Sequence, residues 1–198
     1  MTAPRIKSLN SRQAEKATLR SLELMDERNV KLNSRLVGSL LLNSLDVKVI
    51  VFIKNYFFRR VHNGKDKKAL DFLIKHSSEK TNPNALSRIN ILLLLAELAQ
   101  EGKIKETLPG LLIGVTDSNM FVRKNAMFGL CHLAELGVKE VLPELFKGLD
   151  CDDITTRKLA AKGVEYLAEK GDREAQEGLR LIKNGHVWMI NLKRKKGV

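Results

Sequence analysis

Three arginines recur at equivalent places in a repeated pattern, each close to the start of an expected helix: Arg88, Arg123 and Arg157. A guanidinium group is planar and can donate two parallel hydrogen bonds to an anion. One interpretation is therefore a row of anion-binding residues. We favour the other, a structural ladder in which each arginine pairs with an acidic turn residue such as Asp117, Asp152 or Asp153 of its own or the next repeat.

His132 and Glu135 have the spacing of two metal ligands on one helical face. The pair is not repeated, because Tyr166 and Glu169 stand at the matching positions. The four histidines, at positions 62, 76, 132 and 186, show no ligand spacing. We therefore expect no metal site and no cofactor.

The sequence also shows no residue pattern that indicates a catalytic nucleophile. Cys131 and Cys151 form neither a disulfide framework nor a metal-binding pattern. The residue after Cys131, His132, points elsewhere because consecutive residues of a helix face different directions. The sequence contains no glycine-rich phosphate loop and no serine elbow. We expect no catalytic residue and no enzymatic activity.

Aromatic and basic residues are densest over 52–68. Aromatic side chains between arginines can stack on bases, but a helical spacing also suits a buried seam, and we expect Phe52, Phe57 and Val61 to belong to the core. The basic residues of this stretch are candidates for nucleic-acid binding: Arg59, Arg60, Lys65, Lys67 and Lys68.

The C-terminal tail has four consecutive basic residues: Lys193, Arg194, Lys195 and Lys196. They could contact phosphates with salt-dependent affinity, or lie in solvent at a frayed end. The net charge of +12 gathers at the two ends, with +4 over 1–45, +5 over 46–80 and +4 over 172–198. A basic field attracts nucleic acid, anionic lipid or acidic protein surfaces; the alternative is that it serves only solubility.

The elements that position these residues repeat. Residues 108–137 align with 142–171 at an offset of 34 without a gap, and 12 of the 30 positions are identical. Self-similarity at a fixed period of this size indicates a helical array. Each unit predicts two helices, over 105–115 and 119–136 in the first and over 139–149 and 153–170 in the second. Polar turns supply the N-caps, and Gly137 and Gly171 end the second helices.

Further helices are expected on both sides of this pair. A more degenerate copy precedes it, with helices at about 66–76 and 85–101, and a truncated copy follows at 172–185. Apolar periodicity also predicts helices over 11–27, 30–45 and 47–61, the last in preference to a strand. The fold class is all-α, with about nine or ten helices.

The stretch "LPGLLIGVTDSNMFVRKNAMFGLCHLAELG" resembles a HEAT repeat, in particular the short type also found in phycobilisome-lyase-like proteins. The matching positions are Leu108, Pro109, Leu111, Leu112, Asp117, Val122, Arg123, Ala126, Leu130, Leu133 and Gly137. The second copy departs from this pattern with Cys151 in place of Asp117 and Thr156 in place of Val122. The resemblance covers roughly 85–185 and implies a right-handed, armadillo-like α-solenoid of antiparallel helix pairs with a binding or scaffold role.

We expect one helical-repeat domain over 1–198, with degenerate helices over 1–65, HEAT-like repeats over 66–185 and a basic tail over 186–198. Its expected function is non-enzymatic binding of a protein partner in a concave groove, through residues that differ between copies: Phe128, His132, Lys162 and Tyr166. The alternative is DNA or RNA binding through the basic ends. The chain has neither a secretory signal nor an apolar run of bilayer length, so we expect a cytoplasmic protein without a membrane partner.

Overall fold

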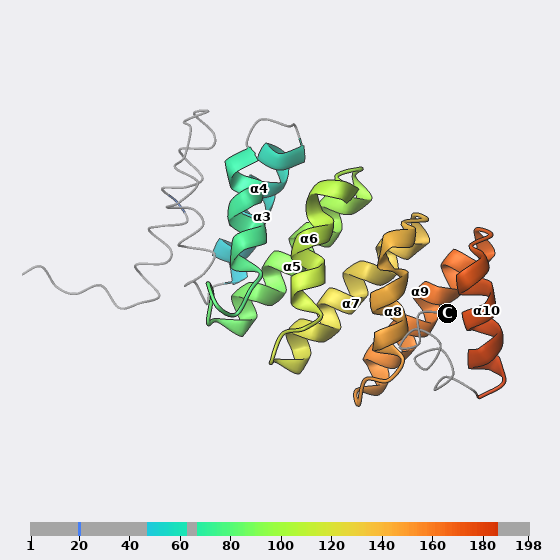
Figure 1. Cartoon of the computed structure of the whole chain (residues 1–198). Coiled ribbons are helices and arrows are strands. Elements are labelled where there is room, and N and C mark those ends of the chain that lie inside the picture. The colour runs from blue at the N-terminus through green and yellow to red at the C-terminus, as the bar shows by residue number, and fades with distance from the viewer. Residues whose placement is uncertain (1–19, 21–46, 63–66, 186–198) are drawn as a thin grey trace, which may run out of the picture.

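The computed structural model describes residues 20, 47–62 and 67–185, and this part of the chain contains helices and no strand (Figure 1). Its eight α-helices are α3 (Val47–His62), α4 (Lys67–His76), α5 (Ala85–Gln100), α6 (Ile104–Gly114), α7 (Met120–Glu135), α8 (Leu142–Gly148), α9 (Ile154–Glu169) and α10 (Arg173–Lys183). A 3-10 turn, η1 (Lys139–Val141), precedes α8. The predicted all-α class is confirmed for the described residues.

Residues 47–62 form a helix, as expected, despite their many β-branched side chains. Phe57 is fully buried and its ring stacks on that of Phe72 from α4, with centroids 6.0 Å apart. Val61 is buried as well, whereas Phe52 is half-buried and packs against the edge of the core. The apolar seam therefore holds α3 against α4 and α5.

The ends of the repeated helices follow the predicted signals. Asn119 accepts hydrogen bonds from the backbone of Phe121 and Val122, and Asp153 accepts one from Thr156. The predicted helix over 139–149 is shorter than expected, because the chain passes through η1 before α8 begins at Leu142. Pro143 lies in the first turn of α8, where a proline is well tolerated, whereas the equivalent Pro109 lies inside α6, so the proline alone does not set the start of α8.

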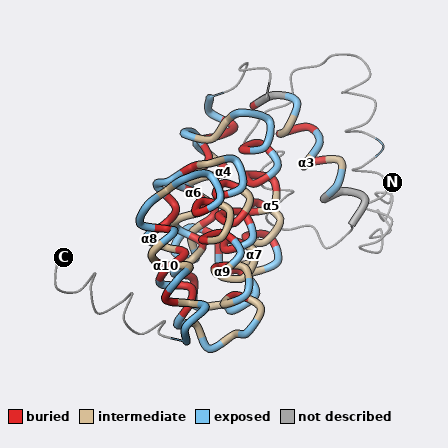
Figure 2. Tube along the Cα trace, turned by 90° about the vertical axis from the view of Figure 1, so that its right-hand side faces the viewer, coloured by how far each residue is buried: buried red, intermediate tan, exposed pale blue. Residues whose placement is uncertain are grey.

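The helices follow one another along the molecule from α3 to α10 (Figure 1). The helices α5, α7 and α9 pack side by side, α6 covers α5 and α7, and α8 covers α9. Buried positions gather inside this stack, and exposed positions surround it (Figure 2). The central second helix, α7, therefore contacts the second helices before and after it.

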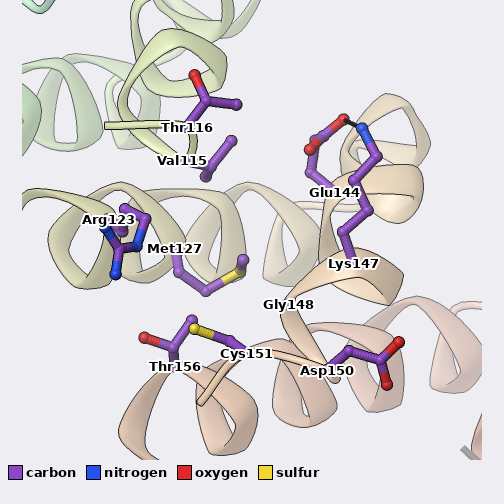
Figure 3. Close-up of a pocket in the computed structure, with 10 residues that line it drawn as sticks. All are labelled: Val115, Thr116, Arg123, Met127, Glu144, Lys147, Gly148, Asp150, Cys151 and Thr156. Carbon is purple, nitrogen blue, oxygen red and sulfur yellow. Dashed lines mark hydrogen bonds and ion pairs between the residues drawn. The ribbon is translucent and has the colours of Figure 1, made fainter. Parts of the chain in front are cut away.

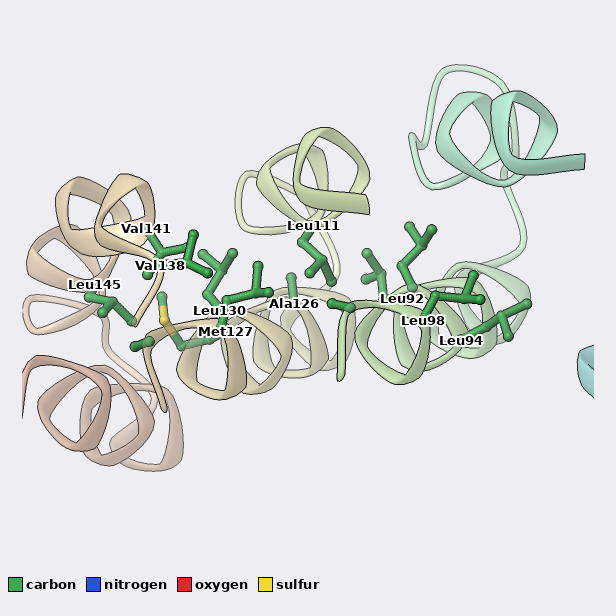
Figure 4. Packing of buried hydrophobic residues seen from close by; sticks show 14 of the residues in the cluster. Leu92, Leu94, Leu98, Leu111, Ala126, Met127, Leu130, Val138, Val141 and Leu145 are labelled. Carbon is green, nitrogen blue, oxygen red and sulfur yellow. The ribbon is translucent and has the colours of Figure 1, made fainter. Parts of the chain in front are cut away.

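The helices form two rows, with the first helices α6 and α8 in one and the second helices α5, α7 and α9 in the other. Leucines from both rows fill the interior (Figure 4). Leu111 of α6, Leu130 of α7 and Leu145 of α8 are fully buried. A Cβ atom at Gly129 would lie 2.7 Å from a methyl group of Leu111, and one at the equivalent Gly163 would lie 2.8 Å from a methyl group of Leu145. These two repeated glycines thus mark points where a first helix lies directly on a second helix.

Candidate functional site

The three repeated arginines close the turns that start α5, α7 and α9. In each copy, Nη1 donates to the backbone carbonyl six residues earlier: Arg88 to Asn82 at 2.7 Å, Arg123 to Asp117 at 2.8 Å and Arg157 to Cys151 at 2.7 Å. In the last two copies the same nitrogen also reaches the following carbonyl. A carbonyl in a turn has no helical partner, so this contact satisfies it while it orients the turn.

Of these three arginines, only Arg88 also forms hydrogen bonds with a carboxylate among the described residues. Its Nε lies 2.7 Å from Oδ2 of Asp117 and its Nη2 lies 2.8 Å from Oδ1. Both side chains are only 1% exposed, and Oδ1 also accepts the backbone N–H of Asn119 at 2.9 Å. This buried bidentate pair joins α5 to the turn before α7.

Arg123 and Arg157 differ from the predicted ladder. Their hydrogen bonds go to backbone carbonyls, and neither pairs with Asp152 or Asp153 among the described residues. Asp153 instead caps α9, where its Oδ2 accepts both the N–H and the hydroxyl of Thr156. The acidic residues of the second turn therefore do not replace Asp117.

The four residues expected to face a partner lie as two pairs at equivalent positions of the packed helices α7 and α9. The Phe128 and His132 rings meet edge to face with centroids 4.5 Å apart. The Lys162 ammonium lies 4.7 Å above the centre of the Tyr166 ring. Phe128 and Lys162 are exposed, while His132 and Tyr166 are half-buried. The structure thus brings these predicted residues to the surface of two neighbouring helices.

Further apolar side chains are exposed on α5 and α7. Phe121 is 54% exposed and stands two helical turns before Phe128, hence on the same side of α7. Leu86 occupies the equivalent position of α5 and is also exposed. We call these three residues with Tyr166 the second-helix face. A helical wheel of α7 could have indicated Phe121, because it falls outside the buried stripe of that helix.

The charged groups around the second-helix face pair with one another. Lys162 Nζ lies 2.7 Å from Glu165 Oε2, and the hydrogen bond lowers the pKa of Glu165 and raises that of Lys162. His132 Nδ1 lies 3.2 Å from Glu135 Oε2. Phe128 and Tyr166 of this face contact the rings or charges next to them, whereas the exposed side chains of Phe121 and Leu86 make no ring contact or ion pair among the described residues. In the described part of the chain, no three His, Cys, Asp or Glu side chains form a possible metal site.

Cys131 is buried in α7, and its burial, with the charge of Glu135 as a smaller cause, raises the pKa of its thiol to about 11. Against an ordinary pKa of 9.0, this reduces the thiolate fraction at neutral pH about 100-fold.

In the folded chain at pH 7.5 we expect iodoacetamide to modify Cys151 and to leave Cys131 largely unmodified, as measured by peptide mass spectrometry. Both cysteines should react equally in urea; equal rates in the folded chain would contradict the burial of Cys131.

The predicted basic candidates fall partly outside the described residues. Arg59 is exposed on α3, and Lys67 and Lys68 are exposed at the start of α4. The Arg60 side chain, Lys65 and the tail residues 193–196 lie outside the described part. No described helix combines the length and apolar character needed to cross a membrane.

No family model, curated protein or solved structure matches the chain.

Proposed function

We propose that the chain is a short right-handed α-solenoid of HEAT-like helix pairs that binds a protein partner and catalyses no reaction. Three features support the solenoid: the repeat of 34 residues, the serial packing of α5, α7 and α9, and the arginine-to-carbonyl contact at the start of each of these helices. Stacked repeats of this kind present extended surfaces that commonly bind other proteins.

The observation that carries the binding proposal is the exposure of large apolar side chains on the second-helix face. Phe121 and Phe128 are 54% and 41% exposed on one side of α7, and Leu86 extends the apolar surface to α5. Exposed apolar groups that lie together mark interaction sites more often than isolated ones do. Aromatic anchors of this kind supply much of the binding energy at protein interfaces. The partner should therefore present apolar side chains to α5 and α7.

The double substitution Phe121→Ala and Phe128→Ala should strongly weaken binding of the protein partner. Loss of one interface anchor commonly costs about 2 kcal/mol, which corresponds to about 30-fold in affinity. Affinity capture from extracts of the native cells, with quantitative mass spectrometry, should show the partner with the unchanged chain and at least a tenfold lower recovery with the double variant.

Ile113 of α6 offers a matched control, because it is 36% exposed but belongs to the other row of helices. The substitution Ile113→Ala should leave recovery of the partner unchanged. Equal recovery with the unchanged chain and the double variant would exclude the second-helix face as the binding surface.

Nucleic-acid binding through the basic ends stays the alternative proposal, supported by the net charge of +12 and its concentration outside the repeats. The same capture experiment separates the two. A protein partner held by the second-helix face should survive nuclease treatment and moderate salt. Recovery that disappears with nuclease and falls steeply with salt would favour the alternative.

A further inference from the structure

A cavity of about 250 Å³ lies between the turn that precedes α7 and the turn that precedes α9 (Figure 3). Arg123 and Met127 of α7 form one side, Cys151 and Thr156 form another, and Lys147 of α8 lies at a third. The cavity thus brings a guanidinium group, apolar carbon and sulfur atoms, and a hydroxyl group to one place.

Two hydrogen-bond donor nitrogens of Arg123, Nε and Nη2, remain available at this cavity. Its Nη1 binds the carbonyl oxygens of Asp117 and Ser118, each at 2.8 Å. Its Nε and Nη2 have no hydrogen-bond partner among the described residues, and no polar side-chain atom of the described part is both buried and unpartnered. This edge of the guanidinium group is therefore held in place by the backbone yet remains accessible.

The equivalent edge in the preceding copy shows what fits there. Nε and Nη2 of Arg88 hold the two carboxylate oxygens of Asp117, a residue of the next turn. The residue that matches Asp117 in the following turn is Cys151. A thiol is a weak acceptor and is shorter than a carboxylate, so Cys151 supplies neither the charge nor the volume of Asp117.

We propose that Arg123 binds a carboxylate from outside the chain, in the place that the Asp117 carboxylate occupies beside Arg88. The apolar atoms of Met127 and Cys151 would contact the aliphatic carbons that carry it. An Asp or Glu side chain or a chain terminus of a protein partner has this chemistry, in which case the inference rests on the proposed function. A small carboxylic acid has the same chemistry without a protein.

Charge around the cavity favours a carboxylate over a phosphate. Lys147 is already paired with Glu144 at 2.6 Å, and Asp150 also lines the cavity. The two cations of the lining are therefore balanced by two carboxylates, which would repel a doubly charged anion more than a singly charged one. Bidentate bonding to a single arginine suits either anion, so this balance of charge is what favours the carboxylate.

The experiment uses the ¹⁵N-labelled full chain and follows the Nε–H signals of its arginines during titration with sodium butyrate at constant ionic strength. The Arg123 signal is identified by its absence in Arg123→Lys. We expect it to shift with saturation, whereas inorganic phosphate at the same ionic strength should shift it at least tenfold less. A response that does not saturate, or one equal for both anions, would overturn the proposal.

Two variants at one position provide the matched comparison. Cys151→Asp supplies an internal carboxylate, so its Arg123 signal should already resemble that of Arg88, and its affinity for butyrate should fall at least tenfold. Cys151→Ala keeps the site open and should bind butyrate as the unchanged chain does. Equal butyrate binding by both variants would contradict a ligand bound in the place of this carboxylate.

A capture experiment with Arg123→Lys separates this inference from the proposed function. We expect recovery of the partner to fall at least tenfold if the partner supplies the carboxylate. Full recovery together with saturable butyrate binding would assign the site to a small carboxylic acid and leave the proposed function intact. Full recovery without butyrate binding would overturn the inference alone.

Discussion

Replacement of Asp117 with alanine should lower the free energy of unfolding by about 3–5 kcal/mol, because it removes one partner of a buried ion pair. Arg88 would keep its charge at 1% exposure and lose both hydrogen bonds of Nε and Nη2. The backbone N–H of Asn119 would lose its acceptor as well. Equilibrium unfolding in urea, followed by helical circular dichroism, measures this loss directly.

Asp152 provides the control for the loss at Asp117. It lies exposed in the equivalent turn of the next copy, and the described contacts there use its backbone carbonyl. The substitution Asp152→Ala should change the stability by less than about 0.5 kcal/mol. The double substitution Arg88→Met and Asp117→Ala should cost less than Asp117→Ala alone, because no uncompensated charge stays buried. A small loss for Asp117→Ala would mean that the pair does not hold α5 to the turn before α7.

Replacement of Phe146 with alanine should cost about 3–5 kcal/mol of stability, the usual range for the loss of a buried aromatic ring. Phe146 is 2% exposed in α8, and its ring edge would lie 2.5 Å from a Cβ atom at Gly178 of α10. The ring therefore fills the space where α10 approaches α8. Its removal leaves a cavity that the stacked helices can close only in part.

The same chemical change at Phe121 provides the comparison for Phe146, because Phe121 is exposed. Phe121→Ala should change the stability by less than about 0.5 kcal/mol in the same urea experiment. Similar losses for the two variants would contradict the assignment of Phe146 to the core and of Phe121 to the surface. The comparison also shows whether Phe121 can be replaced in binding experiments without damage to the fold.

The helices could be predicted closely from the sequence because their signals are local. Asn119 and Asp153 cap the helices that follow them, and Gly137 and Gly171 adopt the left-handed backbone conformation that ends the preceding ones, with φ of 91° and 86°. The period of 34 residues then repeats the same information. The one clear difference is the start of α8, where a 3-10 turn over Lys139–Val141 replaces the first turn of the predicted helix.

The partners of the arginines could be predicted only in part, because they depend on distances between turns. From the sequence, Asp117, Asp152 and Asp153 are equally plausible partners for the arginines. The structure shows that Asp153 caps α9, so its carboxylate is committed to Thr156. Likewise, the exposure of Phe121 could not be predicted from the repeat, because Phe121 is an apolar residue in the first turn of α7 and only the packing shows that it faces away from the core.

The contact from each arginine to the carbonyl six residues earlier bears on how a duplicated chain can diverge. This contact fixes the guanidinium group in all three copies, whichever residue occupies the position of Asp117. Each copy therefore contains an arginine that is already oriented. The residue at the position of Asp117 then determines whether this arginine pairs with the next unit or keeps Nε and Nη2 available to a ligand. New specificity can then arise in one unit while the architecture of the others stays as it was.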